Sequence, residues 1–219
     1  MSDKMKLILE NINFNGDLSI VDRIERPQVS ISQLSYEFEF GKVYHLASER
    51  HWEMWALSLL VAGAIVEQSG VVKFNDNICS VCQRQEISWR VGYTHIKRFG
   101  LFWQNIKSQI LSGIRRGNRY HLSEADYILN FKLTPSRYLR YITQVSSEVW
   151  RASCAIGLAH DKQIFCFPPM QLHRDFIKEY GKLWLFDMLT FMKSLNCLIL
   201  LPLPIDMDTS GFCDGIVKV

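Results

Sequence analysis

Three short segments that are apolar, or apolar except for one histidine, constrain the fold more than any other feature of this sequence. They are Val43 to Ala47, Ile164 to Phe167 and Cys197 to Leu201. Segments of this length with few or no polar positions are typical of strands covered on both faces, as in parallel sheets. Helical patterns precede or follow them, at residues 51 to 62 and 176 to 194. Because parallel strands need long crossover connections, this order predicts an α/β fold with a mostly parallel sheet and flanking helices.

The N-terminal part has the pattern of antiparallel strands. From Tyr36 to Phe40 aromatic residues alternate with glutamates, so the three rings share one face of a strand. Gly70 to Phe74 is predicted to be a further strand, and it ends in an Asn-Asp-Asn turn. Trp89 to Tyr93 is expected to be another strand, and Gly215 to Val219 a last short one.

Helical periodicity dominates from about residue 99 to residue 160. Ser123, followed by Glu124 and Asp126, is predicted to cap a helix there, because a hydroxyl and acidic residues suit a helix N-terminus. We therefore expect one domain over residues 1–219, with a helical subdomain inserted at approximately 99–155.

Composition excludes several classes of protein. Apolar residues make up 48% of the 219 residues, enough for a full core, so global disorder is excluded. The 25 Lys and Arg against 22 Asp and Glu give a net charge of +3, too mild for a dedicated nucleic-acid binder. The longest nearly apolar run, Met54 to Val66, falls short of the ~20 residues that span a bilayer. With no signal-peptide core either, we expect an intracellular chain with no nucleic-acid partner.

Two of the six cysteines have the spacing of metal ligands. Cys79 and Cys82 form a C-x-x-C pair, but no second pair follows, and a zinc site needs two more ligands. Two ordinary thiols in a loop are therefore favoured over a metal or redox site, and we expect no bound metal.

The order of segments resembles that of an ABC transporter nucleotide-binding domain. Leu60-Val-Ala-Gly63 is similar to the Leu-Leu-Ala-Gly-like end of that family's first helix, and Ser69 to Asp76 to its Ser-Gly-x-Ile/Val-x-Phe-x-Gly hairpin. Val91 to Tyr93 resembles the strand before the Q-loop. Ala155 to Asp161 resembles the helix that approaches the Walker B strand, and Cys213 to Val219 the closing strand. The resemblance covers nearly the whole chain and implies the ABC ATPase fold.

The resemblance aligns the segment after the first buried strand with the Walker A loop. That loop uses glycines, a lysine and a Ser/Thr pair to hold phosphates and Mg²⁺. The corresponding positions here hold Ser48, His51 and Glu53 for the glycines, Met54 for the lysine, and Trp55 and Ala56 for the Ser/Thr pair. A carboxylate repels phosphate and two tryptophan rings fill space that a nucleotide needs. We therefore expect that this loop binds no ATP and that the chain has no cofactor.

The position aligned with the Walker B acidic pair holds Pro168 and Pro169. In the family the Asp of this pair supports Mg²⁺ and the Glu orients or deprotonates water. Proline has no side-chain oxygen for either task. Leu201 to Pro204, where the family's switch histidine is expected, contains no histidine.

The region that resembles the ABC signature contains Ser146, Ser147, Glu148 and Arg151. The family pattern is Leu-Ser-Gly-Gly-Gln-x-x-Arg, so Arg151 is kept and Glu148 is similar to the glutamine. The glycines that present backbone to a partner's γ-phosphate are absent.

These departures predict a catalytically inactive ABC subunit, or pseudo-ATPase, with no catalytic residues of its own. The resemblance then implies a heterodimer with an active ABC ATPase subunit, docked on transmembrane permease subunits of an exporter of, for example, peptides or antimicrobials. It places the chain in the cytoplasm, peripheral on the inner face of the membrane through these partners. The alternative is a stand-alone adaptor or regulatory protein on a degenerate ABC fold. A weaker third hypothesis is a nucleotide-dependent enzyme that works by an unusual route.

In ABC domains the segment between the Q-loop strand and the signature helix receives a short helix of the permease. Here that segment contains Phe99, Phe102 and Trp103, which we predict to dock a membrane subunit. The alternative is that these rings belong to the core.

Arg115, Arg116 and Arg119 form a basic cluster beside a glycine. A solvated loop is one interpretation, and a site for an anion or a lipid surface is the other.

Overall fold

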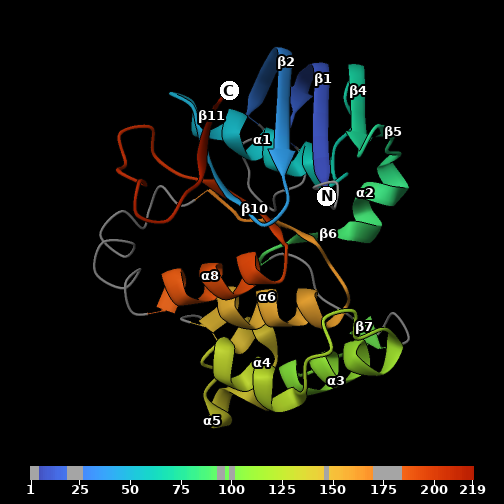
Figure 1. Cartoon of the computed structure of the whole chain (residues 1–219), viewed down its shortest axis with the longest axis vertical. Helices are drawn as coiled ribbons and strands as arrows, with labels where there is room; N and C mark the ends of the chain where they lie inside the picture. Colours follow the sequence, from blue (N-terminus) through green and yellow to red (C-terminus); the bar gives the residue numbers. More distant parts are fainter. Residues whose placement is uncertain (1–4, 19–26, 93–96, 99–101, 146–147, 170–183) are drawn as a thin grey trace.

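The computed structural model describes residues 5–18, 27–92, 97–98, 102–145, 148–169 and 184–219. These residues are arranged in layers (Figure 1). An antiparallel sheet lies at one end, followed by helix α1, a parallel sheet and a group of helices at the other end.

The parallel sheet has at its centre the three apolar segments singled out in the sequence. Its strands are β3 (Val43–Ala47), β6 (Ser88–Arg90), β9 (Ile164–Cys166), β10 (Leu198–Pro202) and β11 (Gly215–Lys218). Their order is β11-β3-β10-β9-β6, and each neighbouring pair is parallel. Every residue of β3, β9 and β10 is buried, because layers cover both faces of the sheet. The predicted α/β fold with a parallel sheet is confirmed.

The second sheet is antiparallel, as the alternation in the sequence predicts. It contains β1 (Lys6–Asp17), β2 (Gln28–Glu39), β4 (Ser69–Phe74) and β5 (Asn77–Ile78) in the order β2-β1-β4-β5. One face is buried against the core, as at Phe38, and the neighbouring Glu37 is exposed. This is the arrangement that period-two patterns favour.

Helix α1 (His51–Val61) lies between the two sheets and is buried at every position from Met54 onward. It shares one hydrophobic core with Leu46, Ile164 and Leu198, whose side chains point from the parallel sheet toward it. The helix ends before Gly63, which has φ +66° and whose added Cβ would lie 2.8 Å from the Val81 carbonyl oxygen. Glycine is therefore required at this turn by both conformation and space.

A second core covers the opposite face of the parallel sheet. Phe165, Ile199 and Leu201 point into it, as the strand alternation requires. The helices on this side are α3 (Ile106–Arg116), α4 (Glu124–Asn130), α5 (Pro135–Tyr138), the 3₁₀ helix η1 (Ile142–Gln144), α6 (Val149–Ala159) and α8 (Phe186–Ser194). None of the described helices is long and apolar enough to cross a membrane.

The predicted cap at Ser123 is present, since its hydroxyl oxygen accepts the Asp126 amide. The expected helix over 176–194 is observed from Phe186, and residues 176–183 lie outside the described residues.

Three local predictions were wrong. The segment with Cys82 is not a loop but helix α2 (Val81–Ile87), which Ser80 begins with a capping box to Gln83. A hairpin of β7 (Lys97–Arg98) and β8 (Phe102–Trp103) occupies part of the stretch expected to be helical. Strand β6 ends at Arg90 instead of Tyr93, because Val91 and Gly92 form a turn.

Candidate functional site

The candidate site lies at the carboxyl edge of the parallel sheet. Because β3, β9 and β10 run parallel, the segments after them leave from the same edge, and ligands of open α/β folds bind at such edges. Ser48 follows β3, Pro168 follows β9 and Leu203 follows β10. The Leu203 amide donates to the Leu46 carbonyl at 3.2 Å, which holds two of these segments together.

Glu53 folds back over the N-terminus of α1. Its carboxylate accepts the Ser48 hydroxyl at 2.5 Å and lies 3.8 Å from the Arg50 guanidinium. The Ser48 oxygen in turn accepts the Arg50 amide at 3.1 Å. Backbone amides at a helix N-terminus favour a negative charge. The chain therefore supplies its own carboxylate in the first turn of this helix.

The side chains beside Glu53 pack as core and as an aromatic cluster. Met54 and Ala56 are fully buried, and Trp55 is almost so. The ring of Trp52 lies 5.8 Å from that of Trp55 and 4.3 Å from that of His51, measured between centroids. The first two turns of α1 thus fill the space under the antiparallel sheet with apolar volume.

At the ends of the neighbouring strands, Pro168 is buried and Pro169 is half-buried. Sequence reasoning did not single out the buried histidine His45, which lies beside Leu203. His45, in the middle of β3, contacts the Thr209 hydroxyl and the Leu203 carbonyl, each at 3.2 Å. Burial lowers the pKa of His45 from its ordinary value, so the ring is held neutral near pH 7. Val43 and Ala47, which share a face of the strand with His45, are apolar, so no pattern in the sequence indicated a polar contact here.

Glu148 and Arg151 of the signature-like region form a buried ion cluster. The Glu148 carboxylate lies 3.3 Å from the guanidinium groups of both Arg137 and Arg151 and accepts the Thr134 hydroxyl at 3.0 Å. Arg151 also donates to the Lys132 carbonyl at 2.9 Å. These contacts join α6 to the chain around α5. Ser146 and Ser147 lie outside the described residues.

The predicted docking residues are only partly described. Phe99 lies outside the described residues, and Phe102 and Trp103 are described by their backbone, which forms β8. The structure therefore does not test whether these rings dock a partner.

The C-x-x-C pair is divided between two environments. Cys79 is buried, which raises the pKa of its thiol, and Cys82 is exposed on α2. Within the ranges that the structure describes, no three His, Cys, Asp or Glu side chains converge on a point where a metal ion could bind.

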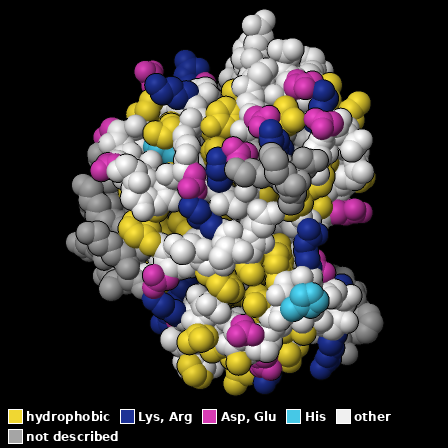
Figure 2. Space-filling view, in the orientation of Figure 1, with side chains coloured by type: hydrophobic (Ala, Val, Ile, Leu, Met, Phe, Trp, Pro, Cys, Tyr) yellow, Lys and Arg dark blue, Asp and Glu magenta, His cyan; other side chains and the backbone are white. Residues whose placement is uncertain are grey.

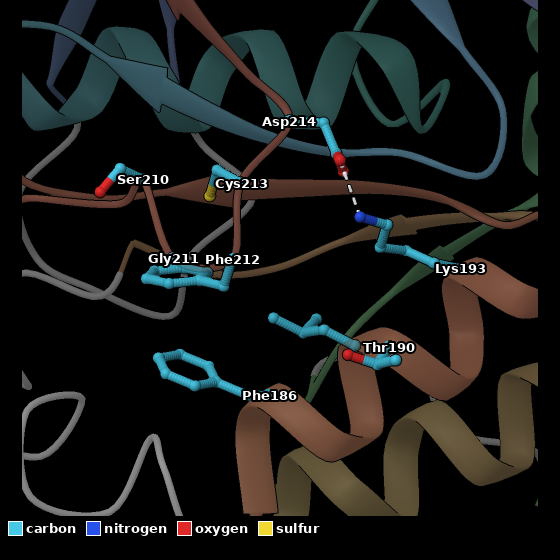
Figure 3. A pocket seen from close by; sticks show the side chains of 9 residues that line it. Phe186, Thr190, Lys193, Ser210, Gly211, Phe212, Cys213 and Asp214 are labelled. Atoms are coloured by element: carbon cyan, nitrogen blue, oxygen red, sulfur yellow. Dashed lines mark hydrogen bonds and ion pairs between the residues drawn. The ribbon is translucent and has the colours of Figure 1, made fainter.

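A small cavity lies at the other side of the sheet, between α8 and residues 210–214 (Figure 3). It holds about 160 Å³ and is open to solvent. Its charged groups pair with each other, since Lys193 lies 2.7 Å from Asp214, and the rings of Phe186 and Phe212 stack with centroids 4.7 Å apart. Burial raises the pKa of Cys213 to about 12, so this thiol is no nucleophile near pH 7. The cavity offers no reactive group.

No protein-family model and no curated protein matches the sequence. Solved structures do match. CbiO1 from Clostridium perfringens, part of the ABC transporter complex CbiONQ, has a TM-score of 0.68 and 14% identity, covering 99% of this chain and 85% of that one. MJ0796, a dimeric bacterial ABC transporter cassette, has a TM-score of 0.69 and 12% identity over 97% and 94%. A bacterial Atm1-family ABC exporter with ATP bound has a TM-score of 0.66 and 13% identity over 100% of this chain but 37% of its own. The chain therefore has the fold of ABC transporter ATPase domains.

Proposed function

We propose that this chain is a catalytically inactive ABC subunit, which pairs with an active ABC ATPase and acts with the permease of an exporter. The shared fold supports a place in such a complex, because the matching structures include a cassette, a complex subunit and an exporter. The residues at the sheet edge where a nucleotide would bind argue against hydrolysis.

One observation carries the proposal: the Glu53 carboxylate occupies the N-terminal turn of α1. In phosphate-binding loops, backbone amides at this position approach the anion. Here Ser48 and Arg50 bind Glu53, whose side chain is only 16% exposed. A nucleotide phosphate would meet a negative charge and would have to displace these contacts. Met54, at the lysine position of the resemblance, is fully buried in the core and provides no cation.

The groups that hydrolysis needs are also missing from the end of β9. Phosphoryl transfer to water requires a ligand for Mg²⁺ and a residue that orients or deprotonates the water. Pro168 and Pro169 provide neither. An active partner would have to supply both.

The same reasoning favours a heterodimer. In the family that the chain resembles, each nucleotide site uses the Walker motifs of one chain and the signature of the other. Two copies of this chain would assemble no complete site. In this proposal Glu148 and Arg151 brace α6 instead of contacting a partner's nucleotide, which their mutual ion pair supports.

Purified chain with Mg²⁺ and ATP tests the catalytic part of the proposal. We expect hydrolysis no faster than a buffer blank and no thermal shift at millimolar ATP, whereas ligand well above its Kd must stabilise a native protein. An intact ABC ATPase measured alongside is the positive control. Turnover above the blank, or a shift of several degrees, would contradict the proposal.

Purification of the chain from native membranes tests the partners. Co-purification of an intact ABC ATPase and a permease is the expected result. A native complex that holds only copies of this chain would contradict it and favour the stand-alone adaptor.

A further inference from the structure

Charge is distributed very unevenly along the chain. Residues 97–159 contain ten of the 25 Lys and Arg but only three of the 22 Asp and Glu, which leaves 15 basic and 19 acidic residues elsewhere. The mild overall charge of +3 therefore combines a strongly basic helical region with a body of the opposite sign. Lys and Arg side chains lie among hydrophobic ones on this region, at the bottom of the view in Figure 2.

Four arginines of this region have no acidic partner within the described residues. Arg115, Arg116, Arg119 and Arg140 are exposed, and none of them forms an ion pair there. Lys107, Lys132, Arg137 and Arg151 of the region are paired, with Glu124, Asp187 or Glu148. Among the described side chains of this region, positive charge without an ion-pair partner is thus concentrated in these four arginines.

The four arginines mark the two ends of α3. Arg115 and Arg116 lie in its last turn, and Arg119 follows in the turn after it. At the other end, the Arg140 carbonyl accepts the Ile106 amide at 3.0 Å. An 11-residue helix is about 16 Å long. The helix packs its buried side against α6, whereas the four arginines, in its last turn, after it and beside its first turn, are exposed. We call this surface the α3 basic face.

Groups of both signs surround the Arg115 end. Asp161 accepts the Arg119 amide at 2.7 Å, and Lys162 donates to the carbonyls of Gln85 and Glu86. The ring of His160 is hydrogen-bonded to the Gln109 carbonyl at 3.0 Å, and the pKa of this ring is lowered chiefly by burial. The three arginines and Lys162 exceed the carboxylates of Asp161 and Glu86, so the local field is positive near neutral pH.

Exposed apolar side chains accompany these cations. Leu129, Leu139 and Tyr141 of the same region are 74%, 61% and 44% exposed, and Tyr141 directly follows Arg140. Arginines beside exposed leucine and tyrosine are typical of surfaces that rest on anionic lipid, where tyrosine suits the headgroup level. Nucleic acid would use the cations but not the leucines. A permease is a poor match in charge, because cytoplasmic loops of membrane proteins carry excess Lys and Arg.

We propose that the α3 basic face binds anionic phospholipid headgroups directly, without a protein partner. The anionic leaflet attracts each nearby cation, and the effect of several cations adds. This contact is separate from the pairing with an ATPase and a permease, and it would orient the helical region toward the membrane.

Co-sedimentation of the purified chain with vesicles tests the proposal. Vesicles of phosphatidylcholine with phosphatidylglycerol should retain the chain at low salt, and vesicles of phosphatidylcholine alone should not. The triple variant R115Q/R116Q/R119Q should bind on the order of a hundredfold more weakly, since each cation contributes about fivefold. The control variant K6Q/K73Q/K218Q removes three lysines that lie outside residues 97–159, and it should keep nearly full binding.

A charge-conserving variant guards against a folding defect. R115K/R116K/R119K should retain the chain on anionic vesicles, because lipid attraction depends on charge and not on the guanidinium fork. Binding that is equal on both kinds of vesicle, or that the glutamine variant leaves unchanged, would overturn the proposal. Retention on an RNA homopolymer but not on anionic vesicles would also overturn it. None of these measurements involves ATP or a permease, so their outcome is independent of the proposed function.

Discussion

Two glutamates stand at the N-termini of two helices, and they differ in their surroundings. Glu53 of α1 has one hydroxyl within 2.5 Å and one distant guanidinium, and its side chain is 16% exposed. Glu148, just before α6, has two guanidinium groups at 3.3 Å and the Thr134 hydroxyl, and it is 2% exposed. Both residues occupy positions where the ABC resemblance expects motif residues.

The difference shows that similar sequence changes have different physical meanings. At α1 a carboxylate lies in the first turn of the helix, and apolar side chains fill the neighbouring volume. At α6 a carboxylate has become the centre of an ion cluster that joins separate segments. Removing the charge of the first should disturb a local turn, whereas removing the charge of the second should take from Arg137 and Arg151 the carboxylate that they share.

The largest expected effect is that of Glu148→Gln. The variant keeps the volume but removes the charge that Arg137 and Arg151 share, and breaking a buried pair in this way lowers the free energy of unfolding by about 3 kcal/mol. In a domain of this size the melting temperature should fall by roughly 6–12 °C. Urea denaturation measures the free energy directly.

Glu124→Gln is the matched control for this prediction. Glu124 also faces a cation, Lys107 at 3.6 Å, but both side chains are partly exposed, and the Tyr138 hydroxyl at 3.1 Å can donate to a glutamine as well. Its loss should lower stability by less than about 1 kcal/mol. Equal effects of the two variants would contradict the distinction between the regions.

Lowering the pH should destabilise the folded chain in both regions, because each contains a buried histidine. His45 precedes the α1 turn and His160 follows α6, and burial lowers the pKa of each. The unfolded chain, with ordinary histidine pKa values near about 6.5, then binds protons more readily than the folded chain. Stability should therefore fall as the pH drops through about 6.5, where the unfolded chain begins to bind protons that the folded chain does not.

Thermal unfolding between pH 5.5 and 8 measures this slope. His160→Gln should reduce this slope, because the variant lacks the imidazole whose pKa burial lowers. A slope that stays the same in His160→Gln would show that this ring is not held neutral.

Glu53→Gln should have a small effect on stability. The amide can still accept the Ser48 hydroxyl, and the lost interactions are the helix dipole and the Arg50 contact at 3.8 Å, together less than about 1 kcal/mol. Denaturation in parallel with Glu148→Gln gives the comparison. A loss as large as that of Glu148→Gln would mean that the α1 turn is itself a stabilising cluster.

The smallest effect concerns the thiols and should leave stability unchanged. Cys82 is exposed on α2 and should react first with iodoacetamide at pH 8. Burial raises the pKa of Cys166 and of Cys197 to about 12, so these should react only in denaturant. Mass spectrometry of the modified peptides checks the order, and Cys82→Ser should abolish the fast reaction.

The sequence predicts the layers of this fold well because burial alone defines them. Strands β3, β9 and β10 lie within apolar runs, and α1 is apolar on all sides because sheets cover it on both. The α2 helix was missed, although Ser80 and Gln83 carry the capping signal, because seven residues show little periodicity. The β7–β8 hairpin was missed because each of its strands has two residues.

The contacts of the candidate site are less predictable, since they join residues that are distant in sequence. Ser48 and Glu53 are close enough in the chain for the turn to be foreseen. Arg137 and Glu148 are 11 residues apart, and His45 and Thr209 are 164 apart. Nothing local to these residues reveals the pairing, because the fold alone brings them together.

The position of β11 has a consequence for folding during synthesis. This strand pairs with β3, and the Asp214 carboxylate accepts the Val43 amide across 171 residues of sequence. Until the ribosome has released residue 218, one side of β3 has no neighbouring strand, although β3 itself is made early. Contacts of such separation close slowly, and an unpaired strand invites aggregation. The nascent chain should therefore depend on a chaperone, or on a partner that shields this edge, for most of its time on the ribosome.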